Sequence, residues 1–506
     1  MTSDDERVDR ALAVLSRGPH RLAWRDSQEL KRAVRRRQVR QRSGIAAAGV
    51  AAGTALAVGA AAMVSGPVSP QPPVRLAVAA RLGSAAELMA KVSPLSAAAG
   101  SAERAAVAAT EQGFAVRLLQ QVSRTHTGNL TVSPMSLAVA LTMLENGAVG
   151  ETQSQIAATL GSSALAIADQ DRGWASLLSS LRRAGSTATV SLQSADSLWL
   201  QKRLQMQPAF MAAMARYFAT GVWQCDFARN LPGAERAINQ WVSQHTNGKI
   251  TKLFAPGDLS QSTVAVLANA VHFLASWQTP FEPDLTAAGL FHTSQGQAVR
   301  VAYMDQLVQH AVVTSGYQAV QLPYAGGRFA AVAIMPRGQS LAGFVNGLTP
   351  AQLSRIIGAA RRGESAYLSL PRFTTHNYLN LRDTLSAMGM PMAFTPAADF
   401  SAMIQGSVQV QSAVQRDYLS VAEKGTEAAA ATGISVMPTS YVYAPSISFD
   451  HPFLFLIRDT LTGTVLFASL VQQPGATTLR MHMVQVRPHG IHFPPMPAGS
   501  PAAGGQ

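Results

Sequence analysis

In the segment EKGTEAAAATG, residues 423–433, eight of the eleven residues are Gly, Ala or Thr. Its four consecutive alanines are compatible with a helix. With the two-residue period of a strand, however, one face carries only small residues, namely Thr426, Ala428, Ala430 and Thr432. Such a face could enter a sheet that is already packed, and Gly425 before it supplies backbone freedom. The segment therefore predicts either a helix or a strand that joins an existing sheet.

The sequence around this segment alternates between helical and strand-like patterns. AAVAATEQGFAVRLLQQV (105–122) predicts a helix, and AVQLPYAGGRFAAVAIMP (319–336) predicts two strands joined by a Gly-Gly turn. AYLSLPRFTTHNYLNL (366–381) alternates like a strand and leads into a helix at LRDTLSAMGM (381–390). Helices and strands are mixed without regular β-α-β repetition, which predicts an α+β fold.

Seven segments along the chain form a recognisable series. They are NLTVSPMSLAVALTMLENGAVGETQSQI (129–156), INQWVSQHTNGKITKLF (238–254), LANAVHFLASWQTPFE (267–282), LSLPRFTTHNYLNLRDTLSAMGM (368–390), ADFSAM (398–403), the segment 423–433 and DHPFLFLIRDTLTGTVLF (450–467). These motifs resemble the serpin family, and they occur in the family's order from about residue 105 to 474. The N-terminal region and the C-terminal tail lie outside the resemblance.

The resemblance implies a serpin fold, with three β-sheets, about nine helices and an exposed reactive-centre loop that serves as protease bait. It also implies inhibition of a serine protease by a suicide-substrate mechanism. The protease would attack the loop and form an acyl-enzyme, and the cleaved loop would insert into the large sheet before deacylation. A non-inhibitory serpin that acts as a binding or structural module is the alternative.

The resemblance assigns a role to each residue of the loop. Its hinge would comprise Glu423, Gly425, Thr426, Ala428, Ala430 and Thr432. Counting seventeen residues from Glu423 places the scissile bond between Thr439 and Ser440. Thr439 favours an elastase-like or subtilisin-like target, whereas a shift of two residues would present Tyr441 to a chymotrypsin-like protease.

The resemblance also implies a polar cluster beneath the loop, where the large sheet opens. Its members would be Ser133, Ser136, Asn269, Trp277, Arg300 and Gln415. Within this set, Arg300 is expected to pair with Glu423. Two positions depart from the family pattern, because Gln415 stands where His is frequent and Ser469 stands where Gly is usual. Gln415 can form hydrogen bonds but does not titrate near neutral pH.

The N-terminal region predicts a membrane anchor. IAAAGVAAGTALAVGAAAMV (45–64) carries no charge and follows the basic cluster KRAVRRRQVRQR (31–42). Twenty helical residues span about 30 Å, which is the thickness of a hydrocarbon core. Basic residues before the span predict a cytoplasmic N-terminus, with the bulk of the chain on the extracellular side. A cleaved export signal, which would give a secreted protein, and a buried soluble helix are the alternatives.

The composition excludes several classes of protein. In 506 residues, 47% are hydrophobic and 14% charged, which excludes a chain disordered throughout. The single cysteine, Cys225, excludes an intrachain disulfide. Of the net charge of +13, residues 1–44 contribute 12 Lys and Arg against 6 Asp and Glu. The remaining charge is mild for its length, so we expect no nucleic-acid partner.

Motifs of hydrolases, metalloproteases and nucleotide-binding proteins are absent, so we expect no enzyme, cofactor or metal site. We predict five segments: a cytoplasmic basic segment (1–44), a transmembrane anchor (45–64), a linker (65–104), a serpin domain (105–475) and a disordered tail (476–506). The expected protein is a monomeric inhibitor of serine proteases.

Overall fold

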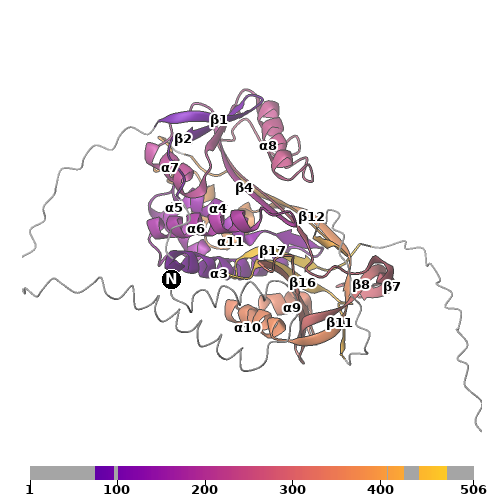
Figure 1. Ribbon diagram of the computed structural model, residues 1–506. Coiled ribbons are helices and arrows are strands. Elements are labelled where there is room, and N and C mark those ends of the chain that lie inside the picture. Colours follow the sequence, from indigo (N-terminus) through magenta and orange to yellow (C-terminus); the bar gives the residue numbers. More distant parts are fainter. Residues whose placement is uncertain (1–74, 96–100, 407, 427–443, 476–506) are drawn as a thin grey trace, which may run out of the picture. The chain divides into compact units, whose positions relative to one another are not determined.

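The computed structural model describes residues 75–95, 101–406, 408–426 and 444–475 (Figure 1). The predicted segments 1–44, 45–64 and 476–506 lie outside these residues. In the described residues there are nine α-helices and three short helical turns. They are α3 (Ser101–Thr125), α4 (Pro134–Glu145), α5 (Gly150–Leu160), α6 (Ile167–Ala184), α7 (Pro208–Ala213), α8 (Leu231–His245), α9 (Leu341–Asn346), α10 (Pro350–Arg361), α11 (Arg382–Ala387), the π-turn η1 (Met214–Phe218) and the 3-10 turns η2 (Pro283–Leu285) and η3 (Pro391–Phe394).

An eight-stranded sheet carries the segment that the sequence singled out. Its strands, in spatial order, are β1 (Leu76–Leu82), β2 (Ala85–Ala90), β5 (Val222–Cys225), β4 (Val190–Gln201), β6 (Ala265–Ser276), β14 (Gly425–Thr426), β13 (Ser412–Ala422) and β12 (Phe373–Asn380). The two-residue strand β14 lies between β6 and β13 near one end of the sheet. This position makes β14 the centre of the candidate site.

The second sheet has nine strands. In spatial order they are β15 (Ser446–Ser448), β11 (Glu364–Pro371), β8 (Ala298–Val313), β9 (Tyr317–Pro323), β10 (Phe329–Pro336), β16 (Phe453–Asp459), β17 (Val465–Val471) and β3 (Leu130–Val132), while β7 (Ala287–His292) pairs with β8 off this path. The long strand β8 contacts β7 and β11 in one part and β9 in another. The third sheet that we expected is therefore joined to the second through β8, and the α+β class is confirmed.

Two segments that we predicted to be strands, 319–336 and 366–381, differ in how well the structure agrees with the prediction. The predicted strand–turn–strand at 319–336 is confirmed as β9 and β10. In contrast, the alternating stretch 366–381 is two strands, β11 and β12, that belong to different sheets. The chain passes from one sheet to the other after Pro371, whose ring nitrogen has no hydrogen to donate to a strand.

The predicted linker at 65–104 is wrong for its central part. Residues 76–90 form the β1–β2 hairpin, and β2 pairs with β5 and so extends the eight-stranded sheet. Leu82 and Ala85 at the turn are buried in a cluster that contains Trp199 and Trp223. The sequence did not predict this hairpin, because its many alanines leave no clear alternation between apolar and polar residues.

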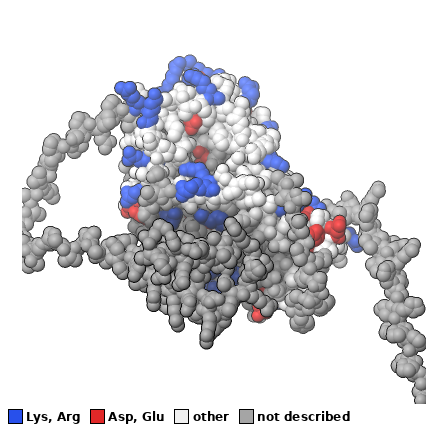
Figure 2. Space-filling view, viewed as in Figure 1, with Lys and Arg blue, Asp and Glu red and all other residues white. Residues whose placement is uncertain are grey.

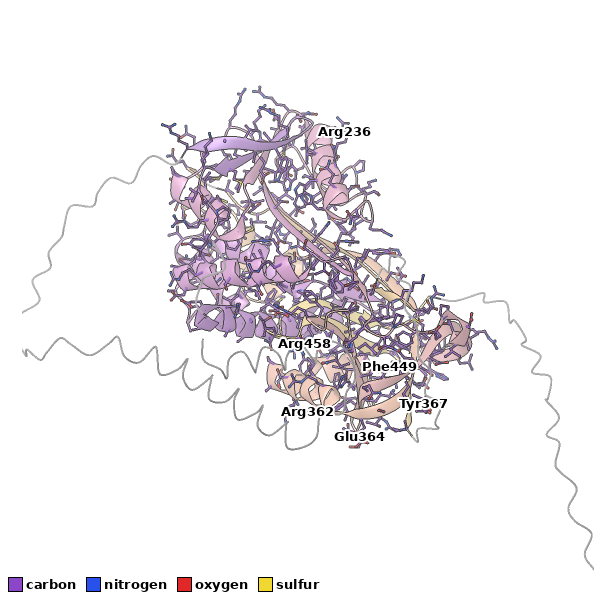
Figure 3. All side chains as sticks on the ribbon, viewed as in Figure 1. Arg236, Arg362, Glu364, Tyr367, Phe449 and Arg458 are labelled. Carbon is purple, nitrogen blue, oxygen red and sulfur yellow. The ribbon has the colours of Figure 1, made fainter. Side chains whose placement is uncertain are left out.

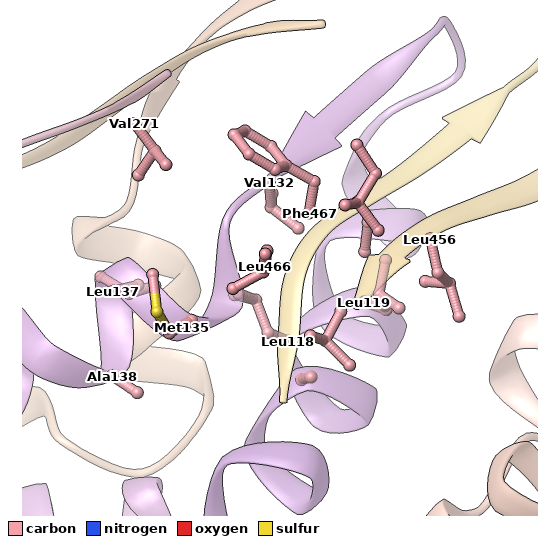
Figure 4. Close-up of a cluster of buried hydrophobic side chains, with 14 of the residues drawn as sticks. Leu118, Leu119, Val132, Met135, Leu137, Ala138, Val271, Leu456, Leu466 and Phe467 are labelled. Atoms are coloured by element: carbon pink, nitrogen blue, oxygen red, sulfur yellow. The ribbon is translucent and has the colours of Figure 1, made fainter. Parts of the chain in front are cut away.

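Part of the main core, shown in Figure 4, is formed by side chains of α3, α4, β3, β6, β16 and β17. Every residue of α4 is buried, and the helix begins with Pro134 at a position where a missing N–H is harmless. Val132, Leu466 and Phe467 pack near Val271 of the eight-stranded sheet (Figure 4). The core therefore packs against the eight-stranded sheet where β6 pairs with β13.

None of the described helices is long and apolar enough to cross a membrane. On the face shown in Figure 2, Lys and Arg occupy several separate places, and acidic side chains lie together at the edge where β7 is found.

Candidate functional site

The eight-stranded sheet is split where β14 enters it. In their N-terminal parts, β6 and β13 pair directly and in parallel, and this pairing ends at Val271 and Asp417. Nearer the end of the sheet, Thr426 pairs with Val421 of β13 and with Ala275 of β6. Residues 418–420 and 272–274 are not paired with each other in the described strands. The hinge therefore holds the two strands apart at the mouth of this gap.

Gly425 is required at the turn into β14. Its φ of +152° lies in a region that other residues rarely adopt, and a Cβ there would lie 2.0 Å from the carbonyl oxygen of Ala275. The backbones of β14 and β6 approach so closely at this point that no side chain fits. This is a physical reason for glycine at the position where we predicted backbone freedom in the hinge.

Thr426 is fully buried, as its predicted inward orientation requires. Its hydroxyl lies 2.5 Å from the hydroxyl of Tyr324, and the Tyr324 ring stacks on Trp277 with centroids 4.4 Å apart. Burial raises the pKa of Tyr324 above its usual range, so the phenol stays protonated. The indole N–H of Trp277 donates to the Ala422 carbonyl at 2.9 Å. Trp277 and Tyr324 thus form the floor on which the hinge rests.

The acidic end of the hinge is anchored by four contacts. The backbone carbonyls of Glu423 and Lys424 accept hydrogen bonds from Phe281 and Trp277, at 2.8 and 3.0 Å. The Glu423 carboxylate accepts from the Thr286 hydroxyl at 2.8 Å and lies 3.4 Å from Nε of Arg372. Glu423 is 8% exposed, so these contacts hold the start of the hinge in a buried position.

The expected pairing of Arg300 with Glu423 is wrong, because the cation at this carboxylate is Arg372. Arg300 is an exposed residue of β8 and pairs with Leu290 of β7 in the other sheet. Arg372 stands just before β12, where the chain changes sheets. Only the three-dimensional position of this crossing brings Arg372 beside Glu423, so the sequence pattern alone could not select it.

Four of the six residues predicted for the polar cluster, namely Ser133, Ser136, Asn269 and Gln415, lie together beneath the gap. The Gln415 amide donates to the Ser133 carbonyl at 3.1 Å and to Oδ1 of Asn269 at 3.0 Å. The Ser133 hydroxyl donates to the Leu466 carbonyl at 2.7 Å, which ties the cluster to β17. Ser136, Asn269 and Gln415 are buried, so these hydrogen bonds replace contacts that water would make.

Asp196 belongs to the same cluster although the sequence analysis did not select it. It stands opposite Asn269 in the β4–β6 pair. Its Oδ1 accepts hydrogen bonds from Nδ2 of Asn269 and from the Ser136 hydroxyl, both at 2.5 Å. This contact depends on the register between β4 and β6, and the sequence does not show how two residues that are 73 positions apart are paired.

Asp417 is a second residue that the sequence analysis missed. It is fully buried, and neither carboxylate oxygen has a hydrogen-bond partner in the described part of the chain. Burial raises the pKa of this carboxyl well above its usual range, because a desolvated carboxylate is unfavourable. Asp417 follows Gln415 by two residues and so shares its face of β13. A buried carboxyl with a raised pKa thus stands at the last directly paired position before the gap.

Ser469, the other departure from the family pattern, is fully buried and its hydroxyl is satisfied. It lies 2.7 Å from the hydroxyl of Thr131, which in turn lies 2.5 Å from that of Thr375. A hydroxyl ladder therefore links β17, β3 and β12, and the extra polar group of Ser469 carries no desolvation penalty.

The far end of the candidate loop is also anchored. β15 pairs in parallel with β11, from Tyr367 with Ser446 to Ser369 with Ser448. Phe449, which follows β15, is buried beside this pair, and its N–H donates to the Ser369 carbonyl at 3.0 Å (Figure 3). The remaining predicted loop residues, Ala428, Ala430, Thr432, Thr439 and Ser440, lie outside the described residues.

A hinge that enters a split sheet above a polar cluster is the arrangement that the family resemblance implies. The family model described as serpin, serine protease inhibitor, matches residues 109–474. This chain belongs to the serpin family. The predicted serpin domain thus has both the sequence pattern and the geometry of the family. The β1–β2 hairpin precedes the matched region, so it is an addition to the part that the family model covers.

Individual serpins resemble this chain over most of their length. Human neuroserpin is 30% identical over 361 residues, which is 68% of this chain and 86% of the relative. Plasminogen activator inhibitor 1 from Neovison vison is 33% identical over 384 residues, covering 73% of this chain and 93% of the relative.

Solved serpin structures share the fold. The thermophilic serpin tengpin in its native state superimposes with a TM-score of 0.67 at 26% identity, covering 72% of this chain and 94% of tengpin. Thyroxine-binding globulin in complex with thyroxine gives a TM-score of 0.64 at 27% identity, covering 72% and 99%.

Proposed function

We propose that this serpin inhibits a serine protease by acting as a suicide substrate. The protease cleaves the loop between Thr439 and Ser440 and is held as an acyl-enzyme. The released hinge side of the loop then extends β14 down the gap between β6 and β13. The observation that carries this proposal is the state of Thr426, which is already buried and paired with strands on both sides.

The small side chains of the hinge support insertion. With Thr426 facing the core, strand alternation turns Ala428, Ala430 and Thr432 to the same side. Side chains of this size can enter a packed sheet without displacing the core beneath it. A full inserted strand adds roughly ten backbone hydrogen bonds at about 0.5–1.5 kcal/mol each, which gives on the order of 10 kcal/mol to hold the protease.

The target follows from the residue presented at the cleavage point. Thr439 is neither basic nor aromatic, which favours an elastase-like or subtilisin-like protease. Cleavage two residues later would present Tyr441 and favour a chymotrypsin-like protease. Mass spectrometry of the peptide released by each of the three proteases identifies the bond that is cut.

The decisive experiment compares two arginine variants of the loop. Ala430→Arg places a large charge on the face that must enter the sheet, whereas Ala431→Arg places the same charge on the opposite face. We expect the unmodified chain and Ala431→Arg to form an SDS-resistant adduct with pancreatic elastase. Ala430→Arg should be cleaved while the protease keeps its activity. Equal behaviour of the two variants, or cleavage of the unmodified chain without an adduct, would favour a non-inhibitory serpin instead.

Loop cleavage also tests the metastable fold on which inhibition depends. If the cleaved loop becomes a strand of the large sheet, the cut protein should unfold at a distinctly higher temperature than the intact protein. The Ala430→Arg variant is the control, because its loop can be cut but is blocked from inserting. A cut protein that melts at the same temperature as the intact one would rule out the mechanism.

We further propose that the serpin domain acts as a monomer on the extracellular side of the cell membrane. Residues 45–64 would anchor it there with the N-terminus in the cytoplasm, and secretion after cleavage of this segment is the alternative. Protease added outside intact cells should remove the domain and spare an N-terminal tag. Protection of both ends would contradict the orientation, and domain free in the medium would support secretion.

A further inference from the structure

Two histidines and an aspartate from distant parts of the sequence lie together beside the second sheet. His292 ends β7, whereas Asp450 and His451 connect β15 to β16. Each offers a ligand atom, and these atoms all lie within 4.8 Å of one another. We propose that His292, Asp450 and His451 form a binding site for a zinc-like divalent transition metal, which would link β7 to the chain segment behind the reactive loop.

The backbone on both sides of the cluster is held in place. The N–H of His292 donates to the Asp450 carbonyl at 2.8 Å. Phe291, before His292, and Phe449, before Asp450, are both fully buried and each makes an edge contact with Phe453. Since these anchors fix the three neighbouring positions, only side-chain rotation is needed to complete a site. Such preorganisation lowers the entropic cost of binding.

The three side chains already occupy related positions. The imidazole rings of His292 and His451 stack with centroids 4.8 Å apart and an angle of 20° between their planes. Nδ1 of His451 lies 2.8 Å from Oδ1 of Asp450. Tetrahedral zinc, with ligands at about 2.0–2.1 Å, needs donor atoms roughly 3.3 Å apart. The exposed histidines can close the remaining distance by small rotations.

The donor set selects the class of metal. Two neutral imidazoles and one carboxylate suit zinc, cobalt, nickel or copper, whereas calcium and magnesium prefer an all-oxygen shell. Asp450 and His451 also line a cleft of about 980 Å³ together with Ser294 and Gln295, which follow His292. This cleft leaves room for water to complete the coordination shell, so the ion is accessible from solvent.

The position of the site implies that a bound ion would restrain the C-terminal end of the candidate reactive loop. β15 holds the C-terminal end of the candidate reactive loop to β11, and Asp450 follows the last residue of β15 after Phe449. An ion shared with His292 would fasten this end of the loop to β7. Because the donors come together only in the folded chain, the metal should also raise the unfolding temperature.

The test uses zinc with the full chain and measures binding by calorimetry at pH 7.5. We expect one zinc per chain at this site, and affinity at least tenfold weaker in His292→Ala and in His451→Gln. His376→Ala, which removes an exposed histidine of β12, should leave affinity unchanged. The unmodified chain should unfold at a temperature about 2–5 °C higher in saturating zinc.

A second variant separates this site from the C-terminal tail, where His489 and His492 lie close in sequence. The double variant His489→Ala/His492→Ala should keep the zinc-dependent rise in unfolding temperature. Cobalt in place of zinc should give the visible absorption of a nitrogen- and oxygen-ligated ion, and this signal should vanish in His292→Ala. Zinc binding that survives loss of His292, or that disappears with the tail histidines, would overturn the proposal.

Discussion

The hydroxyl of Thr426 lies 2.5 Å from the hydroxyl of Tyr324, at the point where the hinge enters the large sheet. Thr426 is the first residue of the hinge whose side chain faces the core, and Tyr324 comes from the turn between β9 and β10 in the other sheet. One hydrogen bond thus connects the hinge to the second sheet.

We expect Tyr324→Phe to loosen the hinge without disturbing the aromatic stack on Trp277. Loss of this hydrogen bond should lower the free energy of unfolding by about 1 kcal/mol. Limited proteolysis should cut near residue 426 faster than in the unmodified chain. Tyr303→Phe is the matched control, since its hydroxyl donates to the Leu290 carbonyl at 2.9 Å, away from the hinge. An equal change in hinge proteolysis in both variants would contradict the role of Tyr324.

Gly425→Ala should expel the hinge from the sheet. The new Cβ would lie 2.0 Å from the Ala275 carbonyl oxygen, a backbone atom that cannot move aside easily. Gly406→Ala provides the control, because Gly406 also has a positive φ but faces open space. It should lose only about 1 kcal/mol of stability from backbone strain. Hydrogen exchange at Thr426 should increase in Gly425→Ala alone, and protection retained there would refute the close approach.

Arg372→Ala and Arg300→Ala should differ in their effect on the hinge. Arg372 is the cation beside Glu423, but its side chain is 47% exposed, so solvent screening limits the contribution to less than about 1 kcal/mol. We expect Arg372→Ala to accelerate hinge exchange measurably in low salt and less in high salt. Arg300→Ala should leave the hinge unchanged at both salt concentrations. The reverse result would restore the pairing first expected for Arg300.

Because burial raises the pKa of several carboxyls, we expect the free energy of unfolding to fall as the pH rises. Between the usual carboxyl pKa of about 4 and the raised pKa of Asp417, the folded chain keeps a proton that the unfolded chain has lost. Glu145 and Asp171, with pKa values raised to about 7, and Glu111, raised to about 8, act in the same direction. The free energy of unfolding should therefore decrease from about pH 4.5 to 7.

Asp417→Ala should remove its share of this pH dependence. At pH 7.5 we expect a gain of about 1–3 kcal/mol, because an unpartnered buried polar group is lost. The gain should become smaller as the pH falls below the usual carboxyl pKa of about 4, where the carboxyl is protonated in both states. Asp417→Asn is the control for size, since it abolishes titration but keeps a buried polar group. Urea unfolding at a series of pH values provides the measurement, and equal destabilisation of Asp417→Ala at both ends of the range would argue against this account.

Some of the residues singled out in the sequence lie close together in the structure. Residue size and period singled out Gly425 and Thr426, and the resemblance to serpins singled out Ser133, Ser136, Asn269 and Gln415, which the fold brings together. Trp277, which the resemblance placed with the strand that carries Asn269, contacts the start of the hinge through the Ala422 carbonyl. Thr426, Asn269 and Gln415 lie on strands, where alternation determines which way a side chain faces.

The predictions failed where a contact depends on strand register or on crossings between sheets. Arg372 reaches Glu423 because the chain leaves β11 for β12 at that point. Asp196 meets Asn269 through the β4–β6 register, and His292 meets Asp450 through the packing of β7. Asp417 was the exception, because alternation from Gln415 already placed a carboxyl on the buried face of β13.

The β1–β2 hairpin lies on the β6 side of the gap, at the outer border of the large sheet, whereas β13 and β12 lie on the other side. A strand that fills the gap drives these two groups apart by about 4.8 Å. Arg75, where the N-terminal segment meets the hairpin, moves with the first group, since its carbonyl accepts from the Lys91 N–H at 2.8 Å. If residues 45–64 attach the domain to a membrane as proposed, the attachment point near Arg75 would therefore move relative to β12 and β13 each time the serpin captured a protease.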